Sequence, residues 1–218
     1  MKKLCIAITL SSLTAACGPE VEEQPPEACD QDAAIAERFG SATSTASATA
    51  DFTQDEGVNR VTLDASLGGT ASAAQSSYAY LDLETATLLE LSDAEALTDS
   101  TWDLAFNRSL VRLNSGDSGP AKLSLKRVDG TSWEAASAPS DASDGEIDDV
   151  IDDQCELVTF GQGFIKTAFG QWYDYDFETH TVSVIEDTVF FIHDDATDSV
   201  TKLQIEAYDD GIYTIRWQ

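Results

Sequence analysis

The sequence predicts an all-β domain, either one antiparallel sheet or a sandwich-like pair of sheets, with a meander of strands at its C-terminal end. Short runs of alternating apolar and polar residues recur from residue 57 onward. Clusters of Gly, Asn, Asp and Ser separate these runs, and no segment shows a sustained helical period. Short strands at this spacing, with turn signals between them, are typical of all-β domains.

The first expected elements precede residue 98. Residues 30–39 predict a short helix, and residues 40–50, which are rich in Ala, Ser and Thr, predict a loop. After these, the pattern predicts strands at 58–64, 78–83 and 88–91, a turn at 67–70 and one helical turn at 94–97.

The clearest alternation lies at residues 101–108. Trp102, Leu104 and Phe106 are expected on one face of this strand, and the intervening residues, Asp103 among them, on the other. Residues 109–113 are expected to continue the strand, 114–120 to form a turn and 121–128 a further strand. Residues 137–153 are expected to form a solvated acidic loop.

The C-terminal third predicts strands at 181–185, 188–193, 200–208 and 212–217. Asp209-Asp210-Gly211 has the composition of a tight hairpin turn. The last three strands follow one another with short connections, so we expect them to form an antiparallel meander.

The N-terminus predicts an exported lipoprotein. Residues 1–16 have a basic start, a short apolar stretch and a small-residue cleavage site before Cys17, which resembles the cysteine that receives a lipid in bacterial lipoproteins. The alternative is an ordinary secretory signal cleaved near Ala16. Residues 17–50 are expected to form an acidic, low-complexity tether, and residues 51–218 the folded domain. The predicted location is therefore a membrane surface, with the outer membrane favoured.

Charge and cysteine content further narrow the kind of protein that this sequence can be. The chain has 12 Lys and Arg against 40 Asp and Glu; removal of Lys2 and Lys3 with the signal leaves ten cations and a net charge of −30. Such a charge excludes nucleic acid as a partner by repulsion. Cys5 leaves with the signal and Cys17 takes the lipid, so Cys29 and Cys155 are expected to form a disulfide in an oxidising compartment.

Two stretches resemble the HmuY-like haem-binding lipoproteins. The first is Trp102-Asp103-Leu104-Ala105-Phe106-Asn107-Arg108, followed by Asn114-Ser115-Gly116 and Ser118-Gly119. The second runs from Trp172-Tyr173-Asp174-Tyr175 to Lys202-Leu203-Gln204-Ile205 and Tyr208. The resemblance extends over about residues 57–218. The resemblance implies an all-β fold, a lipid anchor, haem capture at the cell surface and delivery to an outer-membrane haem receptor.

The resemblance also implies haem iron held between two His or Met side chains. Met1 is the only methionine and leaves with the signal, so His180 and His193 are the candidate axial ligands. The haem propionates would need basic partners, and the available cluster is Arg108, Arg112, Lys122, Lys126 and Arg127. Alternation is expected to place Arg108 and Arg112 on one face.

Other functions have weaker signals. The 137–153 loop does not match the EF-hand pattern, although a looser calcium site stays open. Five aromatic residues form a possible ligand platform of a carbohydrate-binding module, or simply part of the core: Trp102, Trp133, Trp172, Phe177 and Trp217. No nucleophile motif is present and no carboxylate pair stands out, so we expect no enzyme activity.

The sequence thus leaves three hypotheses. The first is a surface lipoprotein that binds haem. The second is a structural or interaction lipoprotein that kept this fold and lost haem ligation, and the third is a carbohydrate-binding module.

Overall fold

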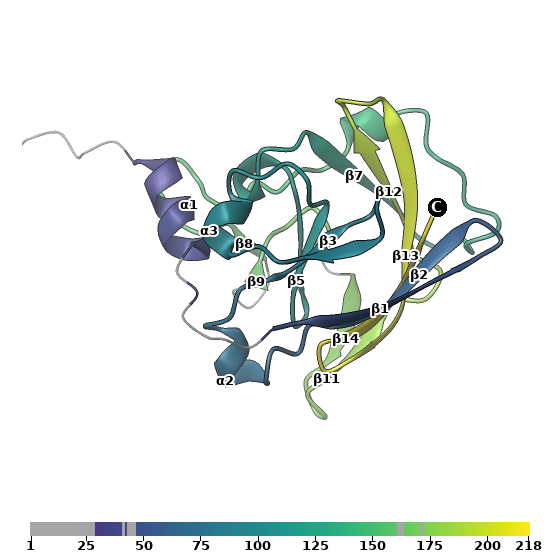
Figure 1. Ribbon diagram of the computed structural model, residues 1–218, viewed down its shortest axis with the longest axis horizontal. Helices are drawn as coiled ribbons and strands as arrows, with labels where there is room; N and C mark the ends of the chain where they lie inside the picture. Colours follow the sequence, from purple (N-terminus) through teal and green to yellow (C-terminus); the bar gives the residue numbers. More distant parts are fainter. Residues whose placement is uncertain (1–28, 41, 43–46, 161–163, 171) are drawn as a thin grey trace, which may run out of the picture.

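The computed structural model describes residues 29–40, 42, 47–160, 164–170 and 172–218. The predicted signal peptide and half of the predicted tether, Cys17 included, therefore lie outside the described residues. The domain is antiparallel β, as the sequence predicted (Figure 1). Its larger sheet has six strands in the order β1-β2-β14-β13-β12-β7. The strands are β1 (Thr49–Asp55), β2 (Val58–Asp64), β7 (Leu123–Val128), β12 (Val189–Asp194), β13 (Ser199–Asp209) and β14 (Ile212–Trp217).

A second sheet has four strands in the order β4-β3-β5-β6. These are β3 (Ala79–Asp82), β4 (Thr87–Leu89), β5 (Leu104–Asn107) and β6 (Leu110–Leu113). The main buried cluster takes Leu81 and Phe106 from this sheet and Leu63, Ile205 and Ile215 from the larger one. Because both sheets bury one face in the same cluster, they pack against each other as a sandwich-like pair.

The C-terminal meander is confirmed. Strand β12 pairs with β13, and β13 pairs with β14, each antiparallel. The turn between β13 and β14 holds Asp210 and Gly211 at φ 45° and 99°, the left-handed conformation that a tight hairpin requires. Along β14 the alternate residues Tyr213, Ile215 and Trp217 are buried, which is the period-2 pattern expected of a strand with one face in the core.

Two expectations for residues 101–113 were wrong. Trp102 packs with Ala105 in a separate cluster, away from Leu104 and Phe106, because the regular strand begins only at Leu104. The segment 109–113 does not continue that strand. Arg108 has φ 50°, which turns the chain back so that β6 pairs with β5. No Gly, Asn or Asp stands at this left-handed position, so the hairpin had no turn signal.

Shorter elements connect the sheets. They are α2 (Thr70–Ala73), α3 (Asp93–Ala96), the 3-10 turns η1 (Gly116–Ser118) and η2 (Ala142–Asp144), and the hairpins β8 (Thr159–Phe160)–β9 (Phe164–Ile165) and β10 (Tyr173–Asp176)–β11 (Thr181–Val184). Helix α3 begins at a capping box in which Ser92 and Glu95 hydrogen-bond to each other's backbone N–H groups. Within the described ranges, every helix is too short or too polar to cross a membrane.

Helix α1 (Gln31–Phe39) lies against the domain beside α3 (Figure 1). Asp30 caps its first turn by accepting a 3.1 Å hydrogen bond from the Ala33 N–H, and Phe39 is buried with Val150 and Ile151. The expected helix at 30–39 is thereby confirmed. It falls within the range 17–50 that was predicted to be the tether, so part of that range belongs to the folded domain.

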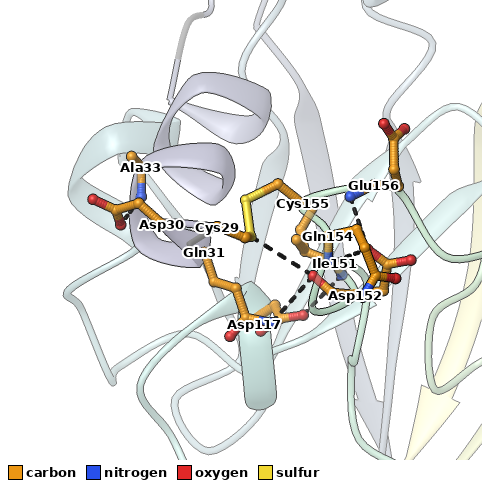
Figure 2. The surroundings of a disulfide bond; sticks show 10 residues. All are labelled: Cys29, Asp30, Gln31, Ala33, Asp117, Ile151, Asp152, Gln154, Cys155 and Glu156. Carbon is orange, nitrogen blue, oxygen red and sulfur yellow. Dashed lines mark hydrogen bonds between the residues drawn. A yellow bond between two sulfur atoms is a disulfide. The ribbon is translucent and has the colours of Figure 1, made fainter. Parts of the chain in front are cut away.

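The expected disulfide is present. Cys29 and Cys155 are joined immediately before α1, and the Gln31 side chain donates a 3.2 Å hydrogen bond to the carbonyl of Asp152 (Figure 2). The Asp152 carboxylate in turn accepts from the backbone N–H groups of Gln154 and Glu156, both at 2.9 Å. These contacts hold residues 29–31 to the 150–156 turn.

Candidate functional site

The Asn-Ser-Gly turn that carries the family resemblance is a structural junction. The Asn114 side-chain amide donates to the carbonyls of Asp99 and Trp102, at 3.1 and 2.7 Å. Its oxygen accepts from the Ala121 N–H at 3.1 Å. Asn114 is fully buried, so these bonds satisfy an amide that would otherwise be costly to enclose. One side chain therefore joins both flanks of the turn to the Trp102 segment.

Close approach explains the two glycines of this turn. A Cβ on Gly116 would lie 2.2 Å from the carbonyl oxygen of Asp148, and Gly116 has φ 52°. A Cβ on Gly119 would lie 2.1 Å from Oδ1 of Asn114 and 2.8 Å from the Trp102 ring. All three distances are shorter than the non-bonded contacts that a Cβ atom makes in proteins. Only glycine therefore fits at these two positions without a shift of the surrounding atoms.

A buried polar network extends from this turn. Arg112 donates from Nε to Oγ of Ser118 at 3.1 Å, and Ser118 donates to Oδ2 of Asp148 at 2.6 Å. Asp148 also accepts from the backbone N–H groups of Leu113 and Ala168, at 2.9 and 2.7 Å. Burial raises the pKa of Asp148 to about 6, even though these donors and the nearby Arg112 charge favour its ionised form. One residue of the predicted solvated acidic loop is therefore a core residue.

Arg112 is enclosed in the core and does not lie at the surface. Its side chain is buried, and its guanidinium lies 4.0 Å from the Phe39 ring centre and 4.8 Å from that of Tyr78. Arg108 instead pairs with Asp210 at the β13–β14 turn. The expectation that Arg108 and Arg112 share a face was wrong, because the β5–β6 hairpin separates them.

Two more members of the expected basic cluster also have carboxylate partners. Lys126 pairs with Asp141 at 3.2 Å, and Arg127 pairs with Asp129 at 2.7 Å. The five candidate residues therefore do not converge on one surface that could hold a pair of propionates.

His193 is enclosed at the end of β12. Its Nδ1 lies 2.9 Å from the Asp195 carboxylate, and its Nε2 lies 3.2 Å from that of Asp198. Both nitrogens thus face acids of the β12–β13 turn. An iron ligand needs one nitrogen lone pair directed into an open pocket. Nδ1 of His193 is buried and, despite the nearby Asp195, has no hydrogen-bond partner, whereas Nε2 pairs with Asp198, so the enclosed ring is poorly placed to ligate iron.

His180 lies in the β10–β11 turn with φ 56° and is exposed. Its Nδ1 is 2.9 Å from the Tyr175 hydroxyl. Phe177 packs against Tyr175 with ring centres 4.8 Å apart and is 58% exposed. The hairpin tip therefore presents an aromatic group with one imidazole.

The two histidines lie in different parts of the structure: His193 is at the end of β12 in the larger sheet, and His180 is in the β10–β11 turn, outside that sheet. By alternation, His193 shares a face with Phe191 and Val189, which pack with Trp133. Tyr175, from the hairpin that carries His180, packs on the main core at the other face. His193 also pairs with Val200 at the start of β13, whereas Trp172, just before that hairpin, contacts Tyr208 near its end.

Eight residues of strand separate Val200 from Tyr208, roughly 25 Å at the usual rise per residue. Axial ligands must approach one iron from its two sides. The structure therefore does not assemble a haem site from His180 and His193, and the residues present do not fit a two-histidine haem.

The aromatic residues and the acidic loop are the remaining candidates for a binding site. Trp102, Trp133, Trp172 and Trp217 are buried, so of the five aromatics considered as a carbohydrate platform only Phe177 is exposed. Across the described chain, no group of three or more His, Cys, Asp or Glu side chains could hold a metal ion. The described acidic loop at 137–153 therefore gives no support to the looser calcium site that the sequence left open.

Several residues of interest carry no signal in the sequence. Asp148 stands among exposed acids, and only the fold shows that it is enclosed. Tyr175 becomes notable through its contact with His180, and Arg38 through its position beside two pockets. Long-range packing creates each of these environments, so a local pattern does not report them.

These features define a class of protein: a two-sheet antiparallel β domain whose Asn-Ser-Gly turn is held by the side-chain hydrogen bonds of Asn114. The model of the HmuY protein family matches residues 74–216, well over half of the chain, so the chain belongs to the HmuY family. This confirms the resemblance drawn from Trp102–Arg108 and from the C-terminal strands. The HmuY family is a family of binding proteins associated with haem. No match to this chain is found among the curated proteins.

Proposed function

We propose that this chain is an exported, lipid-anchored binding protein of the HmuY family, without catalytic activity, that does not hold haem between two histidines. The separation between His180 in the β10–β11 turn and His193 at the end of β12 carries the proposal. The family match supports a binding role, and the carboxylates at both nitrogens of His193 argue against iron ligation there. Of the three hypotheses from sequence, the second agrees best with this geometry.

The anchor is the part of the proposal that rests on sequence. Small residues precede Cys17, and an acidic, proline-rich stretch separates it from the disulfide at Cys29. This order suits a domain held away from a bilayer by an extended linker. Expression in a bacterial host with labelled palmitate tests it. Label should enter the wild-type chain and be lost in Cys17→Ala, and equal labelling of both would contradict the anchor.

Haemin titration tests the absence of a two-histidine site. We expect the absorption spectrum of the full disulfide-bonded chain in detergent to lack the low-spin signature of two imidazoles. His193→Ala should leave the titration unchanged. A saturable low-spin spectrum that either single histidine variant abolishes would overturn the proposal.

A second candidate keeps haem as the ligand through the β10–β11 hairpin. The 2.9 Å contact between Tyr175 and His180 favours it, because a phenol oxygen is a known haem ligand and a neighbouring imidazole can accept its proton. Asp174, Asp176 and Glu178 surround this hairpin and repel propionates, which places the candidate second. A high-spin spectrum lost in Tyr175→Phe would support it, and with it a role in delivery to an outer-membrane haem receptor.

A further inference from the structure

Two neighbouring pockets lie between α1, the β5–β6 hairpin and the β8–β9 hairpin. Their volumes are about 320 and 250 Å³, and both have Arg38, Leu110 and Ile165 in their walls. Pockets that bind small organic ligands start at about 300 Å³, a size that the larger pocket reaches and the smaller one approaches. Because three wall residues are shared, the two pockets form neighbouring compartments of one groove, which we call the Arg38 groove.

Arg38 stands out by its lack of a partner. Among the described residues it makes no hydrogen bond or ion pair, although the chain has 40 acidic residues. The other five arginines each donate to an oxygen; they are Arg60, Arg108, Arg112, Arg127 and Arg216. An exposed guanidinium left open in so acidic a protein is an available site for an anion.

The groove has a mixed lining, and its smaller pocket is the more apolar of the two. Phe160 and Phe164 of the β8–β9 hairpin contact each other at 6.0 Å and line the smaller pocket, and Phe164 is 40% exposed. Phe39 and Tyr78 line the larger pocket. Its one carboxylate, Asp93, accepts from the Tyr78 N–H and the Tyr80 hydroxyl, both at Oδ1.

We infer that the Arg38 groove binds an organic carboxylate with an apolar chain, of the fatty-acid type. The carboxylate pairs with Arg38, and the chain lies against Phe164 and Ile165. This deepens the proposed binding function by naming a ligand class, and it depends on neither histidine. The groove uses residues from α1, so the Cys29–Cys155 disulfide, which holds α1 in place, also holds one wall of the site.

Isothermal titration of the full disulfide-bonded chain with octanoate tests this inference, with octanol as the uncharged probe of equal chain length. We expect saturable octanoate binding that is about tenfold tighter than that of octanol. Arg38→Gln should weaken octanoate about tenfold and leave octanol unchanged. Phe164→Ser should weaken both probes, because it removes a wall for the chain.

Lys122→Gln is the matched control, since it removes one positive charge away from the groove. Octanoate affinity in this variant should equal that of the wild type. The inference is overturned if octanoate gives no saturable heat, or if Arg38→Gln and Lys122→Gln have equal effects. The haemin titration is a separate readout, so failure of this inference is distinguishable from failure of the proposed function.

Discussion

Ser118 donates a 2.6 Å hydrogen bond to Asp148, and both side chains are fully buried. This bond joins the turn of the family motif to a loop thirty residues later in the chain. Leu113 and Ala168 donate to the same carboxylate, so three segments depend on one acid. A buried acceptor with this many donors is costly to replace, because each donor would lose its partner.

Asp148→Asn should lower the free energy of unfolding by about 2–4 kcal/mol. The asparagine NH₂ group would face donors at one of the two oxygen positions. Urea unfolding followed by tryptophan fluorescence measures the change. Asp149→Asn is the neighbouring control; its side chain is exposed, so its effect should stay within about 0.5 kcal/mol. Equal losses in the two variants would show that Asp148 is not the junction described.

Gly116→Ala should cost about 2–3 kcal/mol, since its Cβ would lie 2.2 Å from a backbone oxygen in a left-handed conformation. Gly130→Ala separates the cost of the steric clash from the cost of the left-handed backbone conformation. Gly130 also has a positive φ, 68°, but a Cβ at this residue would meet nothing within 4 Å, so about 1 kcal/mol is expected. Thermal unfolding of both variants should show the larger decrease for Gly116→Ala, and the reverse order would contradict the close approach.

Asp103 makes the free energy of unfolding depend on pH, and the direction of its pKa shift fixes the sign of that dependence. Burial raises its pKa from 3.8 to about 6, and the charges of Asp82, Asp194 and Glu84 act in the same direction. Between these values the folded chain keeps a proton that the unfolded chain releases. The stabilisation from Asp103 is therefore complete below pH 3.8, decreases as the pH rises and is lost above about 6.

Asp103→Asn should flatten the decrease in unfolding free energy across that pH window, measured by urea titration at several pH values. Asp99→Asn should instead remove a contribution to the free energy of unfolding that increases with pH. Hydrogen bonds from Thr101 lower the pKa of Asp99, so its stabilisation is present above the unfolded pKa and is lost as the pH falls. Identical pH profiles for wild type and Asp103→Asn would contradict this assignment.

The Cys29–Cys155 disulfide encloses a separation of 126 residues, for which the chain-entropy model gives about 5 kcal/mol. The paired substitution Cys29→Ser with Cys155→Ser should lower stability by up to this amount. It should also expose Phe39, because α1 would lose its covalent attachment. Limited proteolysis should then cut within residues 30–40 before it cuts the sheets. Resistance equal to that of the oxidised chain would show that packing alone holds α1.

The C-terminal meander was predictable because its signals are local. Alternation sets the faces of β14, and Asp210-Gly211 supplies the turn. The β5–β6 hairpin was missed because Arg108 adopts a turn conformation that its residue type does not indicate. The disulfide followed from counting cysteines. The environments of His193 and Asp148 did not follow, because the fold, and not a local pattern, encloses these side chains and sets their partners.

Electron paramagnetic resonance of the haemin-treated full chain tests the central claim most directly. Because His180 in the β10–β11 turn lies far from His193 at the end of β12, the two cannot ligate one iron, and no low-spin signal of two imidazoles should appear at saturating haemin. The wild type, His180→Ala and His193→Ala should then give the same absence of that signal. A strong low-spin signal in the wild type that either substitution removes would contradict the claim.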